Sequence, residues 1–223
     1  MRKWVNVIAG AALMLLPLSI EAQPVPADVV TVASLNTSST TVDVPVYIRD
    51  VSGSALGIDR PAGQRIQSYS LKVNYTAPAG VVTGVTFTRA GITQTLTPTF
   101  ESNPSSAGTI SLIDVFQEAT NLIPFVSNAP APGNQVAHLV FNLAPGTPNG
   151  TIITLTLDPT LTQLSNEGGT TTESVTLGNL VLVNGSITFL SATTNATAVP
   201  TLGEWGLLLL VAALAIAALR LRL

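Results

Sequence analysis

The feature that most constrains the fold of this chain is a period of two in its apolar side chains. In residues 41–49 every second side chain is apolar, and that set is Val42, Val44, Val46 and Ile48. Such alternation is the pattern of a β-strand with one buried face. Pro45, in the opposite set, has no backbone N–H to donate, so the sequence predicts that the strand lies at a sheet edge at that point.

Segments of this kind recur along the chain with turn signals between them, roughly every 8–12 residues. The predicted strands cover residues 28–35, 41–49, 66–75, 81–89, 92–100, 108–116, 135–143, 151–157, 175–183 and 186–190. Between the two termini, no segment has helical periodicity. The pattern predicts an all-β fold, a single antiparallel β-sandwich of about nine strands with a jelly-roll or Ig-like arrangement.

Three connections carry predictions of their own. Residues 52–65 are rich in glycine and charge and predict an exposed loop, whereas residues 117–132 contain three prolines and predict an irregular excursion. The pair Asn184-Gly185 stands between the last two predicted strands. Because Asn-Gly is the preferred sequence of a two-residue β-turn, this pair predicts a hairpin.

The N-terminus, residues 1–22, has the pattern of a secretory signal peptide. Arg2 and Lys3 precede an apolar run over residues 5–20, and the small residue Ala22 follows. A basic start, an apolar stretch and a small residue are the three parts that a signal peptidase substrate requires. We therefore expect an N-terminal signal helix, removed by cleavage between Ala22 and Gln23.

The C-terminus, residues 199–223, predicts a membrane anchor. Residues 207–219 contain only Leu, Val, Ala and Ile, a run that spans roughly 20 Å as a helix and approaches the ~30 Å hydrocarbon core when its flanking residues are included. We expect a transmembrane helix over residues 206–219, with Arg220 and Arg222 in the cytoplasm and the body outside. A buried C-terminal helix of a soluble domain is the alternative, and the wholly apolar run with its charged end disfavours it.

A short motif precedes this run: Pro200, Thr201, Leu202, Gly203, Glu204, Trp205 and Gly206. Followed by an apolar helix and arginines, it resembles the IPTL-CTERM sorting tail of Gram-negative bacteria, whose usual form is Ile-Pro-Thr-Leu-Ser-Glu-Trp-Gly. Val199 and Gly203 stand here in place of the Ile and the Ser. The resemblance implies an exosortase-like enzyme as a partner, with cleavage near the motif. It gives these residues, with Arg220 and Arg222, the role of a sorting signal and no catalytic role.

The composition of the remaining body, residues 23–190 with a linker at 191–198, narrows its class. The chain has no cysteine, so an exported protein of this sequence gains no stability from disulfides. Between Gln23 and Val199 there are five basic and ten acidic residues. A mildly acidic body without a basic stripe argues against nucleic acid as a partner.

Several segments, in order, resemble the cohesin domain. They are TVDVPVYIR at 41–49, QSYSLKVNY at 67–75 with residues 81–87, HLVFNLAPGTPNGTIITLTL at 138–157 and VNGSITF at 183–189. The resemblance implies a nine-stranded, jelly-roll-like sandwich that binds rather than catalyses, as cellulosomal cohesins bind dockerin modules through one sheet face. No motif carries their contact residues onto this chain. Two departures are Thr76, where members often have Asp, and a longer loop at 52–65.

Few residues in the sequence are candidates for catalysis or metal binding. His138 is the only histidine and lies within a predicted strand, so we interpret it as a strand residue rather than as part of a catalytic triad. Zinc is disfavoured because thiolate and imidazole ligands are nearly absent. We therefore expect no cofactor, no metal and no enzymatic activity.

Three sets of residues remain open to other interpretations. Asp114 and Glu118 can be a glycosidase pair or solvated acids at a strand end. Asp50 and Asp59 flank the glycine-rich loop and can hold Ca²⁺ through their oxygens, although their spacing fits no EF-hand. The aromatic residues Tyr69, Tyr75 and Phe87 can form a sugar-binding platform, with core packing as the stronger interpretation.

The sequence thus predicts an exported cell-surface or extracellular-matrix protein with a cohesin-like binding module. The expected partners are the sorting enzyme, the inner membrane through the C-terminal helix, and a protein module or polysaccharide that the sequence does not identify. The alternative is a carbohydrate-binding module associated with exopolysaccharide. A hydrolase is a third hypothesis, and it requires a cleft with paired acids.

Overall fold

The computed structural model describes residues 26–191 and, close to the C-terminus, residues 206, 208–211 and 214. The predicted signal peptide, its cleavage site at Ala22 and Gln23 and nearly all of the linker and tail lie outside these residues. Residues 206, 208–211 and 214 are helical. No helix among the described residues has the length and apolar character needed to cross a membrane.

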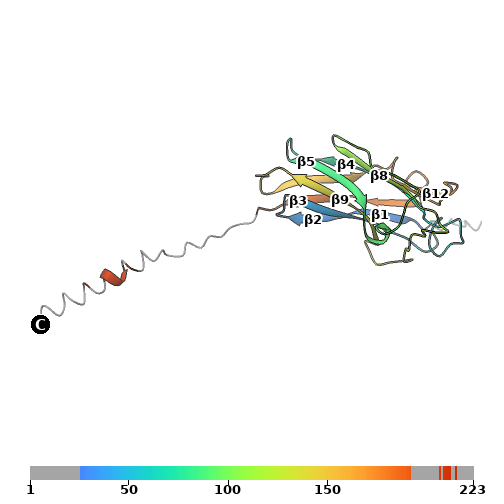
Figure 1. Cartoon of the computed structure of the whole chain (residues 1–223), viewed down its shortest axis with the longest axis horizontal. Coiled ribbons are helices and arrows are strands. Elements are labelled where there is room, and N and C mark those ends of the chain that lie inside the picture. Colours follow the sequence, from blue (N-terminus) through green and yellow to red (C-terminus); the bar gives the residue numbers. More distant parts are fainter. Residues whose placement is uncertain (1–25, 192–205, 207, 212–213, 215–223) are drawn as a thin grey trace, which may run out of the picture.

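The body is a sandwich of two β-sheets whose strands run along its long axis (Figure 1). Sheet A has the strand order β13-β1-β3-β9-β5. Its strands are β1 (Asp28–Val32), β3 (Thr41–Arg49), β5 (Val82–Arg89), β9 (Asn134–Leu143) and β13 (Leu180–Val183). Every pair in this sheet is antiparallel except β1 with β13, which is parallel.

Sheet B is broader and has β4 (Ser68–Thr76) at its centre. Along one edge β4 pairs with β8 over its length, and along the other it pairs first with β11 and then with β10. The remaining strands extend the sheet on both sides, with β14 and β2 joined in parallel. Its strands are β2 (Ser34–Thr37), β6 (Phe100–Ser102), β7 (Ser105–Ser106), β8 (Thr109–Val115), β10 (Thr151–Leu157), β11 (Gln163–Ser165), β12 (Thr172–Ser174) and β14 (Gly185–Phe189).

The core lies between the sheets and consists of the apolar sets that alternate along the strands. β3 and β10 alternate between buried and less buried residues along their whole length. The ring of Tyr75 packs edge-on against Phe141 with centroids 5.5 Å apart, which joins the inner faces of the two sheets. The predicted strands are therefore confirmed within residues 41–49, 66–75, 108–116, 135–143 and 151–157, and in 41–49 the predicted apolar set is the buried one.

Two crossings between the sheets correct the predicted topology. Residues 28–35 are not one strand, because the chain leaves sheet A at Ala33 and enters sheet B as β2. The hairpin predicted at Asn184-Gly185 is also wrong, since β13 belongs to sheet A and β14 to sheet B. The two crossings touch: a Cβ on Gly185 would lie 2.6 Å from the carbonyl oxygen of Val32 and closer still to that of Ala33. The sheets are thus mixed, not purely antiparallel.

Pro45 lies within an interior strand, because β3 is between β1 and β9. The pairing of β3 with β1 ends at Val46, and beyond it the N–H of Ala33 donates to the carbonyl oxygen of Pro45. The missing N–H of the proline therefore faces the point where β1 has ended. The prediction of a sheet edge thus holds only at Pro45, where β3 has no strand partner on one side, and β3 as a whole is an interior strand.

The strand predicted for residues 92–100 does not form. In its place are a short 3-10 helix, η1 (Gly91–Thr93), and turns that lead to β6. The guanidinium of Arg89 donates to the carbonyl oxygens of Thr93 and Leu96 at 3.0 and 2.6 Å, which draws the segment into a coil around it. A side chain outside the segment thus overrides its alternating pattern.

The loop predicted as exposed, residues 52–65, packs partly into the sandwich. Leu56 belongs to the core, and Ser54 is equally buried. The backbone N–H of Leu56 donates to Glu173 on β12 at 2.8 Å. This segment therefore closes one end of the molecule.

Candidate functional site

The outer face of sheet B is a surface on which several strands present side chains of one kind. The registers of β4, β8, β10 and β14 align serine, threonine and asparagine residues in rows across it. We call this surface the sheet B face and define it by Ser68, Ser70, Lys72, Asn74, Ser111, Ile113, Val115, Ile152, Thr154, Thr156, Ser186 and Thr188.

The sheet B face is nearly free of charge. Lys72 is its one charged member, and its ammonium lies 3.4 Å from the carboxylate of Asp158. Apolar side chains interrupt the hydroxyl-rich rows, and one of them, Ile152, is 57% exposed. Phe100 on β6 pairs with Val115 and is also exposed, so the apolar character continues to the edge of the sheet.

The outer face of sheet A is more charged. Asp43 on β3 lies 3.0 Å from Nδ1 of His138 on β9, and Arg49 occupies the same outward phase of β3 as Asp43. Among the hydrogen bonds of the described residues, none joins His138 to a hydroxyl that could act as a nucleophile. His138 is thus a strand residue with an acidic neighbour.

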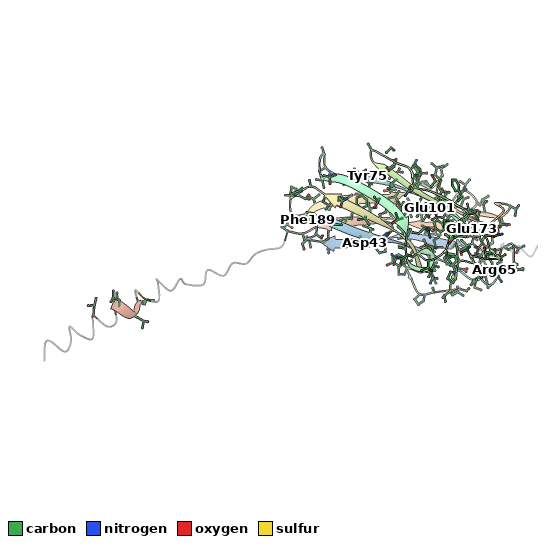
Figure 2. The ribbon with its side chains drawn as sticks, in the orientation of Figure 1. Asp43, Arg65, Tyr75, Glu101, Glu173 and Phe189 are labelled. Carbon is green, nitrogen blue, oxygen red and sulfur yellow. The ribbon has the colours of Figure 1, made fainter. Side chains whose placement is uncertain are left out.

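A third feature is an acidic end formed by Asp28, Asp50 and Glu173. These residues come from the start of β1, the end of β3 and β12, and none has exposed surface. Figure 2 places Glu173 and Arg65 at the opposite end of the body from Asp43 and Phe189. Each carboxylate accepts one backbone N–H at 2.8 Å, from Val51, Ile58 and Leu56, respectively.

The second oxygen of each carboxylate receives no N–H or hydroxyl donor within the described part of the chain. The carboxyl groups of Asp28 and Glu173 interact with each other, which favours a proton shared between them. Burial, followed by the interaction with Glu173, raises the pKa of Asp28 to about 9. Burial also raises the pKa of Glu173 and that of Asp50.

Sequence analysis did not identify Asp28 and Glu173. A signal for Asp28 is present, because it occupies the same phase of β1 as the buried Val30 and Val32. An acid in the apolar phase of a strand must be protonated, paired or bound to a cation. Glu173 sits in a three-residue strand too short to show a phase.

The structure does not join Asp114 and Glu118 in a cleft. Asp114 is buried on β8 next to Tyr69, and burial, with repulsion from Glu101, raises its pKa to about 6. Glu118 accepts the N–H of Gly63 at 2.8 Å and lies 3.5 Å from Arg65. The two acids thus have different surroundings, and Asp114 is not the solvated acid of the alternative interpretation, because it is fully buried.

The three aromatic residues considered for a sugar platform are core residues. Tyr69 is 1% exposed and Phe87 is 0% exposed. Tyr75 packs against Phe141, as described above. The stronger of the two interpretations, core packing, is confirmed.

Of the predicted sorting residues, Gly206 is described, and it is helical and exposed. Pro200, Thr201, Leu202, Gly203, Glu204, Trp205, Arg220 and Arg222 lie outside the described residues. Their roles remain predictions from the sequence.

Comparison with known proteins identifies both parts of the chain. The family model described as the IPTL-CTERM motif matches residues 197–222, which indicates an exported, surface-associated protein. Among curated proteins, none matches the sequence.

Two solved structures resemble the body at the level of the fold. One is the CaDoc0917–CaCohA2 complex, whose CaCohA2 comes from Clostridium acetobutylicum: it is 20% identical, with a TM-score of 0.50, over 73% of this chain and 99% of that chain. The other is the third cohesin of ScaC from Acetivibrio cellulolyticus, in complex with the ScaB dockerin: it is 18% identical, with a TM-score of 0.50, over 74% and 99%. The chain therefore combines a β-sandwich of the cohesin fold with a C-terminal IPTL-CTERM motif.

Proposed function

We propose that this protein is a surface-exposed binding module that recognises a protein partner through the sheet B face. The observation that carries the proposal is the near absence of unpaired charge on a face built from many strands. The cores of protein interfaces are depleted of charged residues, whereas their rims are polar. The sheet B face fits that description, because it consists of hydroxyl groups and scattered apolar side chains. The outer face of sheet A does not fit it, because it carries more charged residues.

The resemblance to the ScaC cohesin supports this proposal, because that protein was solved with a dockerin bound. We propose a role of the same kind here, binding of a protein module without catalysis. Carbohydrate binding, the alternative from the sequence, has no observation of its own in its favour, since Tyr69 and Phe87 are buried.

We further propose that the tail delivers this module to the cell surface. In this scheme the signal peptide directs export, and the apolar run holds the precursor in the inner membrane of a Gram-negative cell. An exosortase-like enzyme recognises residues 200–206 and cleaves near them. The match to the IPTL-CTERM motif supports the scheme.

The binding proposal is tested with two matched variants. Thr154 on β10 and Thr86 on β5 are exposed threonines that point outward from sheet B and sheet A. Thr154→Arg places an unpaired charge in the sheet B face, and Thr86→Arg places one on the other sheet. Each full-length variant is immobilised, exposed to the extracellular fraction of the host, and its retained proteins are identified by mass spectrometry.

We expect Thr86→Arg to retain the same proteins as the wild type and Thr154→Arg to lose them. Loss in Thr86→Arg alone would assign binding to sheet A. Equal retention by both variants would remove the sheet B face from the proposal.

The sorting proposal is tested by fractionating host cells and measuring the intact mass of the protein. We expect a product that begins near Gln23, ends near residue 199 and lies outside the inner membrane. A full-length product that keeps Arg222 in the inner membrane would contradict processing.

A further inference from the structure

The acidic end continues into an arrangement of two carboxylates around Gly57. A Cβ on Gly57 would lie 2.7 Å from Oδ1 of Asp50 and 2.8 Å from Oδ1 of Asp59. The two oxygens therefore lie close to the same point beside Gly57. Any side chain at residue 57 would occupy the space between them, so glycine is the residue that leaves it open.

Both carboxylates are oriented by bonds to their other oxygens. Oδ2 of Asp50 accepts the N–H of Ile58 at 2.8 Å, and Oδ2 of Asp59 accepts the hydroxyl of Ser52 at 2.7 Å. Oδ1 of Asp50 has no donor within the described residues, although Asp50 has no exposed surface. A buried carboxylate oxygen without a partner is costly unless a proton or a cation satisfies it.

The surroundings of Asp50 add negative charge, because Asp28 and Glu173 are buried nearby and interact electrostatically with it. Arg60 is one of the groups that lower the pKa of the neighbouring Asp59. Its guanidinium, however, donates its hydrogen bonds to the carbonyl oxygens of Gly53 and Ser54. Among the described ion pairs, none includes Asp50 or Asp59.

We propose that Asp50 and Asp59 bind one Ca²⁺ ion beside Gly57. The donors are carboxylate oxygens with no sulfur or imidazole among them, which favours a hard cation. Within the described residues, no three His, Cys, Asp or Glu side chains converge as a metal cluster. Calcium suits a site with two carboxylates, because backbone carbonyl oxygens and water complete its coordination shell at about 2.3–2.6 Å.

Through this site a cation would connect the segment 52–65, which closes this end of the sandwich, to β3. Asp50 directly follows β3, whereas Asp59 lies nine residues further along the segment. A bound ion would join the two and neutralise charge that the protein leaves unpaired. The inference is independent of the binding function proposed above.

The test measures the thermal unfolding midpoint of the full-length protein in detergent, first with chelator and then across a CaCl₂ titration, together with the heat of Ca²⁺ binding. A ligand that binds only the folded state raises the midpoint as its concentration exceeds Kd. Asp59→Asn is the informative variant, because Asp59 is exposed and Asn can still accept the Ser52 hydroxyl. Asp43→Asn is the control, an exposed acid on β3 toward the end of the body opposite Glu173 (Figure 2).

We expect Ca²⁺ to raise the midpoint of the wild type and of Asp43→Asn equally. Asp59→Asn is expected to keep the wild-type midpoint in chelator and to bind Ca²⁺ at least about tenfold more weakly, in line with the loss of a charged ligand from a calcium site. A wild-type protein that shows neither a midpoint shift nor heat of binding would overturn the proposal. An Asp59→Asn variant that responds like the wild type would also overturn it.

Discussion

Between the two sheets, away from the acidic end, Phe141 packs edge-on against Tyr75, and no polar group is needed to hold the sheets together there. At the acidic end Asp28, Asp50 and Glu173 are as deeply buried, yet only backbone N–H groups and one another satisfy them. Apolar burial stabilises the folded state at any pH. Burial of carboxylates instead makes stability depend on whatever neutralises them.

The two regions contribute differently to stability. The chain has no cysteine, so the free energy of folding must come from the apolar centre and the sheet ladders. The acidic end opposes folding when it is fully ionised. Protons or cations that neutralise these carboxylates would remove this cost. Changes in the apolar core should therefore have the largest effect on stability, and changes at exposed charges the smallest.

The largest effect is expected in the apolar core between the sheets. Phe141→Ala removes a fully buried ring and leaves a cavity, which destabilises the protein by about 3–5 kcal/mol. The free energy of unfolding, measured with urea at pH 5 and pH 8, should fall equally at both values. A loss that depends on pH would contradict a purely apolar role for this region.

A substitution where the two chain crossings touch should destabilise the protein almost as strongly. Gly185→Ala forces a methyl group against the carbonyl oxygens of Val32 and Ala33, at a cost of about 1–3 kcal/mol. Gly168→Ala is the matched control, because its new methyl group would meet nothing closer than 3.8 Å. Equal midpoints of urea unfolding for the two variants would show that the crossings are not in contact.

The acidic end should respond to pH. The pKa of Asp28 is raised from 3.8 to about 9, so the unfolded chain loses this proton before the folded chain does. The stability from the shared proton is therefore fully present below about pH 4 and is lost as the pH rises toward 9. For one proton the slope is at most about 1.4 kcal/mol per pH unit.

Asp28→Asn should remove that slope, since an amide donates to Glu173 without a titrating proton. The measurement is urea unfolding of both proteins with chelator between pH 4 and 9, and the quantity compared is the difference between their unfolding free energies. A constant difference across this range would contradict the shared proton.

The smallest effect is expected on the outer face of sheet A. His138→Ala removes a pair in which Asp43 is 63% exposed, and such pairs contribute about 0–1 kcal/mol. Thermal unfolding of the variant should give a midpoint close to that of the wild type. A loss as large as that of Phe141→Ala would require a structural role that the exposure of the pair does not indicate.

Local sequence patterns predicted most of the strands but not which strands pair with each other in the sheets. The sequence pattern identified β3, β4, β8, β9 and β10, and in β3 and β4 it also identified the buried set, because burial of one face leaves a period of two in the sequence. The segment 92–100 shows the same alternation, and Arg89 coils it by binding its carbonyl oxygens. The pattern reports what a segment can form, and a contact from outside decides whether it forms.

The candidate site was predictable in part. Asp50 and Asp59 were considered as calcium ligands from their position around a glycine-rich loop, and the structure brings their oxygens to one point beside Gly57. Asp28 and Glu173 were not predicted, because 144 intervening residues conceal that they meet. The pairing of Asp114 with Glu118 was suggested by closeness in sequence, and their different surroundings separate them.

By itself the sequence determined the all-β class, the phases of the main strands and the sorting motif of the tail, all of which are encoded by residues close together in the chain. Only the tertiary structure decided that the chain crosses between sheets at Ala33 and Gly185, that two strand pairs are parallel and that three acids share one buried end. Strand pairing depends on backbone hydrogen bonds that every sequence can make. The choice of neighbour is therefore settled by packing between residues far apart in the chain, which local periodicity does not contain.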